Sequence, residues 1–190
     1  MAAAVLAVGT IACSSSDNSG TPAGPRANHD HWHAAYAISI CGIEQPFLTD
    51  VQPDTLGIHT HGDGIIHVHP FVDTVAGDGA NLGAFLQQVG AVLADSKLSL
   101  PDGTTLEEGH DSCGDQRGQL VVAAWHDASA ADDGKAPDEI RTKNLTDLRL
   151  RDGEAITIAF QPSGGAIPGP SDAAARVQLV TDVLPSTASS

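Results

Sequence analysis

Six of the nine histidines in this chain occur as three His-x-His pairs within one stretch of the sequence. The pairs are His31 and His33, His59 and His61, and His67 and His69. Imidazole is a common ligand of transition metals because its neutral form, which predominates near pH 7, offers a free ring nitrogen. The clustering of these pairs predicts a metal site in which the six side chains are the ligands.

The second and third pairs predict a hairpin that places four imidazoles on one face. Side chains two residues apart on a strand share a face, so strands over 57–61 and 65–69 would each direct two imidazoles the same way. With a three-residue loop at 62–64, His59 lies directly opposite His67 and the alternating apolar residues face a core. A two-residue turn would place the two pairs on opposite faces and break up the cluster.

The first pair joins this cluster only if its strand lies beside the hairpin. His29 shares the same alternation as His31 and His33, so five to seven imidazoles can converge. A tetrahedral site uses three or four ligands, and the surplus implies either two metal ions or histidines that only support the ligands. Asp30 and Asp63 are the nearby carboxylates expected to orient a ligating imidazole.

Zn(II) and Cu(II) are the metals that this ligand set favours. Zinc sites built from a His-x-His pair and a third histidine leave one position for water, and Cu(II) favours several imidazoles in a tetragonal arrangement. Met1 is the only methionine of the chain, so the folded domain has no thioether ligand for Cu(I). The expected cofactor is therefore zinc or Cu(II), and the sequence does not separate them.

Three functions are compatible with this pattern. The protein binds a transition metal for acquisition, buffering or sensing, or it is a metal-dependent enzyme, a hydrolase or copper oxidoreductase, with an open coordination position. The third alternative is an interaction domain whose histidines stabilise a hairpin without metal. The sequence does not define a reaction for the catalytic alternative, because it has no nucleophile elbow, phosphate-binding loop, dinucleotide fingerprint or HExxH motif.

The N-terminus predicts export. Residues 1–13 form a small, apolar segment that ends in Cys13 and is followed at once by serines and an aspartate, as in a bacterial lipoprotein signal with Cys13 as the lipidated residue. No lysine or arginine precedes the apolar run, and Thr10 stands where leucine or valine is usual. The run is too short to span a bilayer. The expected location is the outer face of the cell membrane.

The other two cysteines support the same compartment. Cys41 and Cys113 lie outside any CxxC spacing, and two such cysteines in an exported domain most simply form a disulfide. The alternative is that one or both bind the metal as thiolates. Whether Cys41 and Cys113 are bonded to each other therefore distinguishes a domain stabilised by a disulfide from a metal site with mixed thiolate and imidazole ligands.

The charge of the chain limits its partners. The formal net charge is −15, from 24 acidic and 9 basic residues, and no basic stripe is present to bind phosphates. This excludes a nucleic-acid partner and an anionic membrane surface as a docking site. The expected partners are a metal ion and, through the lipid on Cys13, the membrane; a protein partner stays unknown.

The elements that must position the histidines predict an α+β fold. We expect a signal segment over 1–13, a tether over 14–28, a His-rich metal-binding domain over 29–162 and a Pro/Gly-rich tail over 163–190. Alternating or apolar runs predict strands at 35–41, 57–61, 65–71, 120–125 and 155–160, and apolar spacing predicts one helix over 81–94 with Asn81 as its N-cap. The remaining stretches 103–118 and 128–137 are expected to be loops.

These elements predict a mixed β-sheet packed on one main helix. Residues 148–160 resemble the last turn and strand of ubiquitin-like β-grasp domains, in which a leucine and an Asp-Gly turn precede an alternating strand. This resemblance implies a β-grasp fold. A β-sandwich or a cupin-like barrel is the alternative, although the glutamate expected after a cupin His-x-His pair is absent.

Three blocks also resemble a family of uncharacterised actinobacterial envelope proteins and lipoproteins. The blocks are DHWHAAY at 30–36, GIHTHGDGIIHVHPF at 57–71 and LGAFL at 82–86. The resemblance implies a location in the cell envelope. It implies no activity, because none is known for the family.

Overall fold

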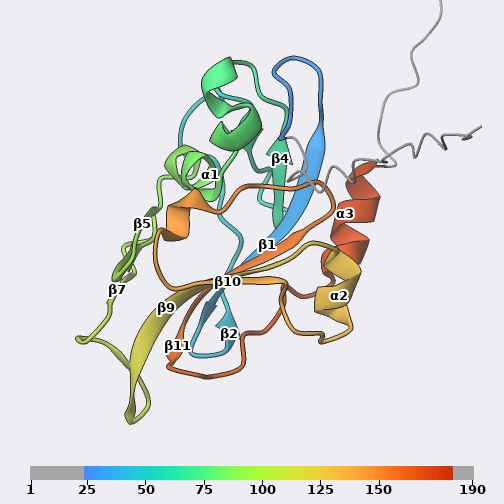
Figure 1. The fold of residues 1–190 in the computed structure, drawn as a ribbon. Helices are drawn as coiled ribbons and strands as arrows, with labels where there is room; N and C mark the ends of the chain where they lie inside the picture. Colours follow the sequence, from blue (N-terminus) through green and yellow to red (C-terminus); the bar gives the residue numbers. More distant parts are fainter. Residues whose placement is uncertain (1–23, 182–190) are drawn as a thin grey trace, which may run out of the picture.

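The computed structural model describes residues 24–181, and its centre is a mixed sheet of eight strands (Figure 1). Six strands follow one another across the sheet in the order β10-β9-β11-β1-β4-β3, while β2 pairs with β1 and β8 with β9. Their bounds are β1 Trp32–Ile40, β2 Ile43–Glu44, β3 Ile58–His59, β4 Ile65–Val68, β8 Ser112–Cys113, β9 Gln116–Trp125, β10 Glu139–Arg141 and β11 Ala155–Pro162.

The sheet confirms the α+β prediction. β1 and β11 are parallel at its centre, with Ala35 opposite Ala155 and Ile40 opposite Phe160, and the other neighbours are antiparallel. This central parallel pairing of an early strand with the last one is consistent with the expected β-grasp arrangement. The cupin-like barrel is wrong, because the strands described here form an open sheet with β10 and β3 at its ends.

One face of the sheet packs on the helix α1 (Leu82–Gln88). Asn81 caps this helix as predicted, since its side chain accepts a hydrogen bond from the Ala84 N–H. The helix is shorter than the predicted 81–94. Gly90 adopts φ +69°, and this left-handed residue ends the helical run, so that Val92–Ala94 forms a strand instead.

That strand belongs to a second, smaller sheet. It consists of β5 Val92–Ala94, β6 Lys97–Ser99 and β7 Thr105–Glu107 in antiparallel order. Leu93 and Leu98 contribute to the same apolar core as α1. The loop expected over 103–118 is therefore wrong in part, because β7, β8 and the start of β9 lie within it.

The opposite face of the main sheet carries the helices α2 (Ala128–Asp132) and α3 (Ala173–Thr181) (Figure 1). They cover a small core that includes Ala35, Ile65 and Trp125. The tail expected over 163–190 thus contains a packed helix, and α2 replaces part of the predicted loop 128–137. The remaining helices are the short 3-10 turns η1 Asp73–Val75, η2 Gly77–Gly79 and η3 Leu145–Asp147.

Side-chain hydrogen bonds from α2 and from α3 itself hold α3 in place. Asp132 of α2 accepts hydrogen bonds from the Ala173 and Ala174 N–H groups at the start of α3. Arg176 donates to the carbonyls of Tyr36 and Gly64, each at 3.1 Å. The second of these contacts fixes α3 to the loop between β3 and β4.

The disulfide prediction is confirmed. Cys41 and Cys113 are joined with an S–S distance of 2.01 Å, and the bond ties the C-terminal end of β1 to β8. Such bonds persist in oxidising compartments outside the cytoplasm. The thiolate alternative for metal binding is wrong, since both sulfurs are bonded to each other.

Within residues 24–181, no helix is long and apolar enough to cross a membrane. Cys13 lies outside the described residues.

Candidate metal centre

Three histidines lie in one row across three neighbouring strands. His33 of β1 is opposite His67 of β4, and His67 is opposite His59 of β3. Their ring centroids are 5.1 Å apart for the first pair and 5.3 Å for the second. The strand of the first His-x-His pair therefore lies beside the hairpin, and the predicted pairing of His59 with His67 is confirmed. The three residues are buried, at 4%, 5% and 8% exposure.

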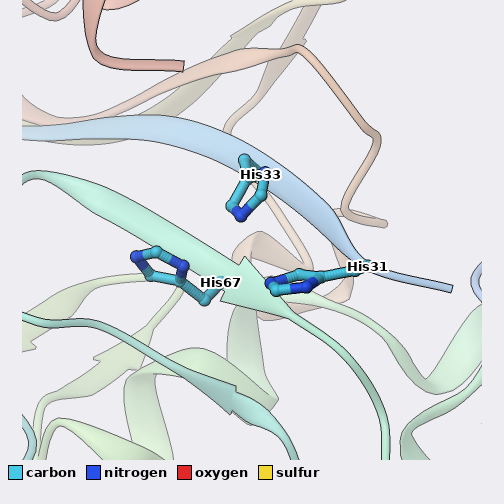
Figure 2. Close-up of side chains that lie close together, drawn as sticks. All are labelled: His31, His33 and His67. Atoms are coloured by element: carbon cyan, nitrogen blue, oxygen red, sulfur yellow. The ribbon is translucent and has the colours of Figure 1, made fainter. Parts of the chain in front are cut away.

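The next row adds two more imidazoles at the strand ends. His31 precedes β1 and His69 follows β4, and their ring centroids are 5.0 Å apart. The ring of His31 also contacts that of His33 at 4.7 Å, and the ring of His69 contacts that of His59 at 4.7 Å. Figure 2 shows the rings of His31, His33 and His67 converging from β1 and β4.

His61 reaches the cluster by a different route from the one predicted. β3 ends at His59, and the N–H of the next residue, Thr60, donates to Asp50 Oδ1 at 3.1 Å. The expected pairing over residues 60–66 is therefore wrong, and His61 is exposed in the loop. Its ring still lies 4.5 Å from that of His67, and its Nε2 is 3.4 Å from Nε2 of His59.

The reverse face of the hairpin is apolar, as the three-residue register predicts. Ile58, Ile66 and Val68 are fully buried in the core shared with α1. Gly64, the last residue before β4, has φ +76°, the left-handed conformation predicted for it, although the loop runs over 60–64 and is longer than predicted. Core packing on one face thus presents the histidines on the other, the face that also carries α2 and α3.

Three carboxylates contact the histidines. Asp54 Oδ2 lies 2.8 Å from Nδ1 of His59, and Asp63 Oδ2 lies 3.2 Å from Nε2 of His67. The contact of Asp54 lacks hydrogen-bond geometry, so Nδ1 of His59 is a buried nitrogen without a hydrogen-bond partner. Asp152 accepts a hydrogen bond from the backbone N–H of His33 at 2.9 Å.

Only one of these carboxylates was predicted from the sequence. Asp63 lies within the His-rich block, whereas Asp54 and Asp152 reach the cluster through turns that no spacing relates to it. The side chain of Asp54 also accepts from the Leu56 and Gly57 N–H groups, and this Asp-turn pattern is the only sequence signal that could have identified it. Asp30, the other predicted carboxylate, instead pairs with Arg26 and with His29, which lies in a turn outside the cluster.

The ligand atoms are close enough to hold a metal ion. Three groups, in each of which one ligand atom per residue lies within 4.8 Å of the others, are present among the described residues. The groups are His31, His33 and His67; His59, His61 and His67; and Asp54, His59 and His69. Nε2 of His33 is likewise buried without a partner. A bound metal ion would satisfy a buried nitrogen of this kind. The six predicted histidines therefore fit a transition-metal ion in number, chemistry and position.

Burial keeps four of these imidazoles neutral, those of His31, His33, His67 and His69. Desolvation, with a smaller contribution from neighbouring imidazoles, lowers the pKa of His31, His33 and His69. Desolvation lowers the pKa of His67 to about 4, although Asp63 opposes the shift. Neutral rings at pH 7 have a free nitrogen for a metal and need not lose a proton to bind it.

The other histidines lie apart from this cluster. His110 and His126 belong to none of the three ligand groups formed by the described residues, and His126 is exposed beside Asp138. No protein-family model, curated protein or solved structure matches this chain.

Proposed function

We propose that this protein binds a transition-metal ion, Zn(II) or Cu(II), through its six clustered histidines. The observation that carries the proposal is the convergence of all three His-x-His pairs on one side of the sheet, where they contribute to three groups whose ligand atoms lie within 4.8 Å of one another in each group. Buried ring nitrogens without partners and nearby carboxylates support it. Zinc and Cu(II) are both compatible with imidazole and carboxylate ligands.

The proposed role is metal acquisition, buffering or sensing at the cell envelope. His31 and His61 are exposed, whereas His33, His59 and His67 are buried. An ion can therefore enter from solvent and be held by the inner ligands. The Cys41–Cys113 disulfide supports a location outside the cytoplasm. Attachment to the outer face of the membrane through a lipid on Cys13 is part of the proposal and rests on the sequence alone.

A metal-dependent enzyme is the second candidate. Each ligand group offers three ligand atoms, and three protein ligands leave a position for a water molecule, as in catalytic zinc sites. Zinc-dependent hydrolysis of a chromogenic ester or phosphate ester would support the hydrolase, and copper-dependent oxidation of a phenol or amine would support the oxidoreductase. Metal binding without either activity supports a binding protein.

Elemental analysis of the loaded protein tests the proposal. The full chain, produced without a polyhistidine tag and dialysed against zinc or copper, is expected to retain at least one equivalent of metal. The double variant His33→Ala/His67→Ala is expected to lose at least half of it, because it removes buried ligands from two of the three groups and leaves only Asp54, His59 and His69 intact. A matched control, His110→Ala/His126→Ala, keeps the wild-type content. Less than about 0.2 equivalents in the loaded wild type contradicts metal binding and favours the interaction domain.

A further inference from the structure

We infer that the histidine cluster holds two metal ions in separate sites; this inference rests on the proposed metal-binding function. Two of the three ligand groups have no residue in common. One consists of His31, His33 and His67, and the other of Asp54, His59 and His69. The remaining group takes His59 from one and His67 from the other, so it describes a single central ion that competes with the two-ion arrangement.

The first of the two sites has only imidazole ligands. His31 directly precedes β1, His33 lies at the start of β1, and His67 lies on β4 (Figure 2). The turn before β11 holds the backbone of His33 on both sides, because Asp152 accepts from its N–H and the Gly153 N–H donates to its carbonyl at 2.8 Å. The backbone of His33, whose buried Nε2 has no hydrogen-bond partner, is thus held in place without a bound ion.

The second site has mixed nitrogen and oxygen ligands. Asp54 is held in a turn by the N–H groups of Leu56 and Gly57, and its Oδ2 lies 2.8 Å from Nδ1 of His59. His69 completes the group, with its ring centroid 4.7 Å from that of His59. The carboxylate neutralises one charge of a divalent ion at this site.

Two observations favour the pair of ions over a single central one. A central ion on His59, His61 and His67 leaves the buried Nε2 of His33 without a partner, whereas in the two-ion arrangement both histidines that have a buried ring nitrogen without a partner are ligands. The carboxylates of Asp54, Asp63 and Asp152 also place three negative charges around the rings, which reduces the repulsion between two divalent ions. His61 is then the exposed residue that neither site requires.

The number of zinc ions per chain tests this inference. The full chain is saturated with zinc chloride, separated from free metal by gel filtration and analysed for zinc and protein. We expect two equivalents for the wild type, one for His31→Ala/His33→Ala and one for Asp54→Asn/His69→Ala. The variant His61→Ala is expected to retain two, and since His61 is an exposed loop residue, this variant does not depend on a core substitution for its fold.

The alternatives give different numbers. One equivalent in the wild type that persists in His31→Ala/His33→Ala and is lost in His61→Ala overturns the two-ion arrangement but leaves the proposed metal binding intact. No zinc in the wild type overturns both. Variants are compared only if their far-ultraviolet circular dichroism matches the wild type; where a double variant fails to fold, the wild type and His61→Ala decide the question. His29→Ala/His110→Ala/His126→Ala, outside the cluster, controls for adventitious zinc and is expected to keep two equivalents.

Discussion

Desolvation lowers the pKa of four histidines of the cluster, His31, His33, His67 and His69, and protonation therefore destabilises the metal-free fold. The pKa of His67 is about 4 in the folded protein, against an ordinary value of 6.5 for histidine. A group with a depressed pKa contributes its stability fully above pH 6.5, and this contribution is lost as the pH falls through 4, because the unfolded chain takes up the proton first. The same protons compete with any metal for the ring nitrogens.

We therefore predict that the metal-free protein loses stability between pH 6.5 and 4. His67 alone is expected to account for about 3 kcal/mol of the loss, and the lowered pKa values of His31, His33 and His69 act in the same direction. Urea unfolding in the presence of a chelator measures it. The variant His67→Asn should show a shallower dependence than the wild type, while His126→Ala should not. Parallel curves for the wild type and His67→Asn would contradict the assignment.

Asp63 orients a ligand, and its removal should weaken binding without removing a site. Its Oδ2 contacts Nε2 of His67, while its Oδ1 accepts from the Ile65 N–H. Asparagine keeps the second contact and removes the charge. We expect Asp63→Asn to lower zinc affinity about 10-fold with an unchanged number of ions, in a competition titration with a chromogenic chelator. Asp30→Asn, which instead breaks the pair with Arg26, is the control. Equal affinities for the two variants would exclude this role.

At the scale of elements, the close approach of β3 to β4 brings the second and third pairs together. Gly57 has φ +83°, and a Cβ atom there would lie 2.2 Å from the carbonyl oxygen of His69. The neighbouring strands can therefore pair at this point only around a glycine. His69 takes part in this contact and His59 lies two residues after Gly57, so both histidines depend on the contact for their position.

The variant Gly57→Ala should therefore both destabilise the fold and disturb the site. We expect a loss of about 3 kcal/mol in urea unfolding, from the positive φ and the clash together, and weaker zinc binding. Gly42→Ala is a matched control, because Gly42 has φ +82° with no atom within 4 Å of the added Cβ. It should cost about 1 kcal/mol from the backbone conformation alone and leave zinc binding unchanged. If the two variants behave alike, the close approach has no role.

Elements differ in how far the sequence predicts them. The alternation in β1, β4 and β11 was sufficient to place these strands, and the need to bury Ile58, Ile66 and Val68 fixed the face of the histidines. The helix predicted over 81–94 is wrong beyond Gln88. The apolar spacing there fits a helix, but Gly90 adopts a left-handed conformation and Val92–Ala94 pairs with β6. Local patterns carry no information on such tertiary pairing.

At the scale of the whole molecule, the disulfide and the histidine cluster secure opposite ends of β1. Cys41 follows the last residue of this strand, and His31 precedes the first. The bond closes a loop with a sequence separation of 72 residues. A cross-link over this length restricts the unfolded chain strongly.

We predict that Cys41→Ser/Cys113→Ser lowers the free energy of unfolding by about 4 kcal/mol at 25 °C. Zinc content at saturation should stay at the wild-type value wherever the variant is folded, because the cluster uses neither cysteine. Chemical unfolding measures the first effect and elemental analysis the second. A loss of zinc from a folded variant would contradict the separation of the two features.

The long-range architecture shows what the sequence could not supply. Spacing and composition predict the convergence of the three His-x-His pairs, the Cys41–Cys113 bond and the α+β class. The packing of α3 on β1 was not, since the Pro/Gly-rich segment before it reads as a tail and its contacts, such as Arg176 with Gly64, cross more than a hundred residues. Asp152 joins the cluster in the same way, through a turn far from His33 in sequence. Asp54 is near His59 in sequence but reaches it only through the turn that precedes β3.

Anomalous diffraction from zinc-loaded crystals at the zinc absorption edge tests the central claim most directly, because it locates the ion itself. The account predicts anomalous peaks on the histidine face, with nitrogen atoms of His31, His33 and His67 about 2.1 Å from one ion and those of His59 and His69 at the same distance from another. Zinc bound only at other residues, such as His110 or His126, with no peak among the clustered rings, would contradict it.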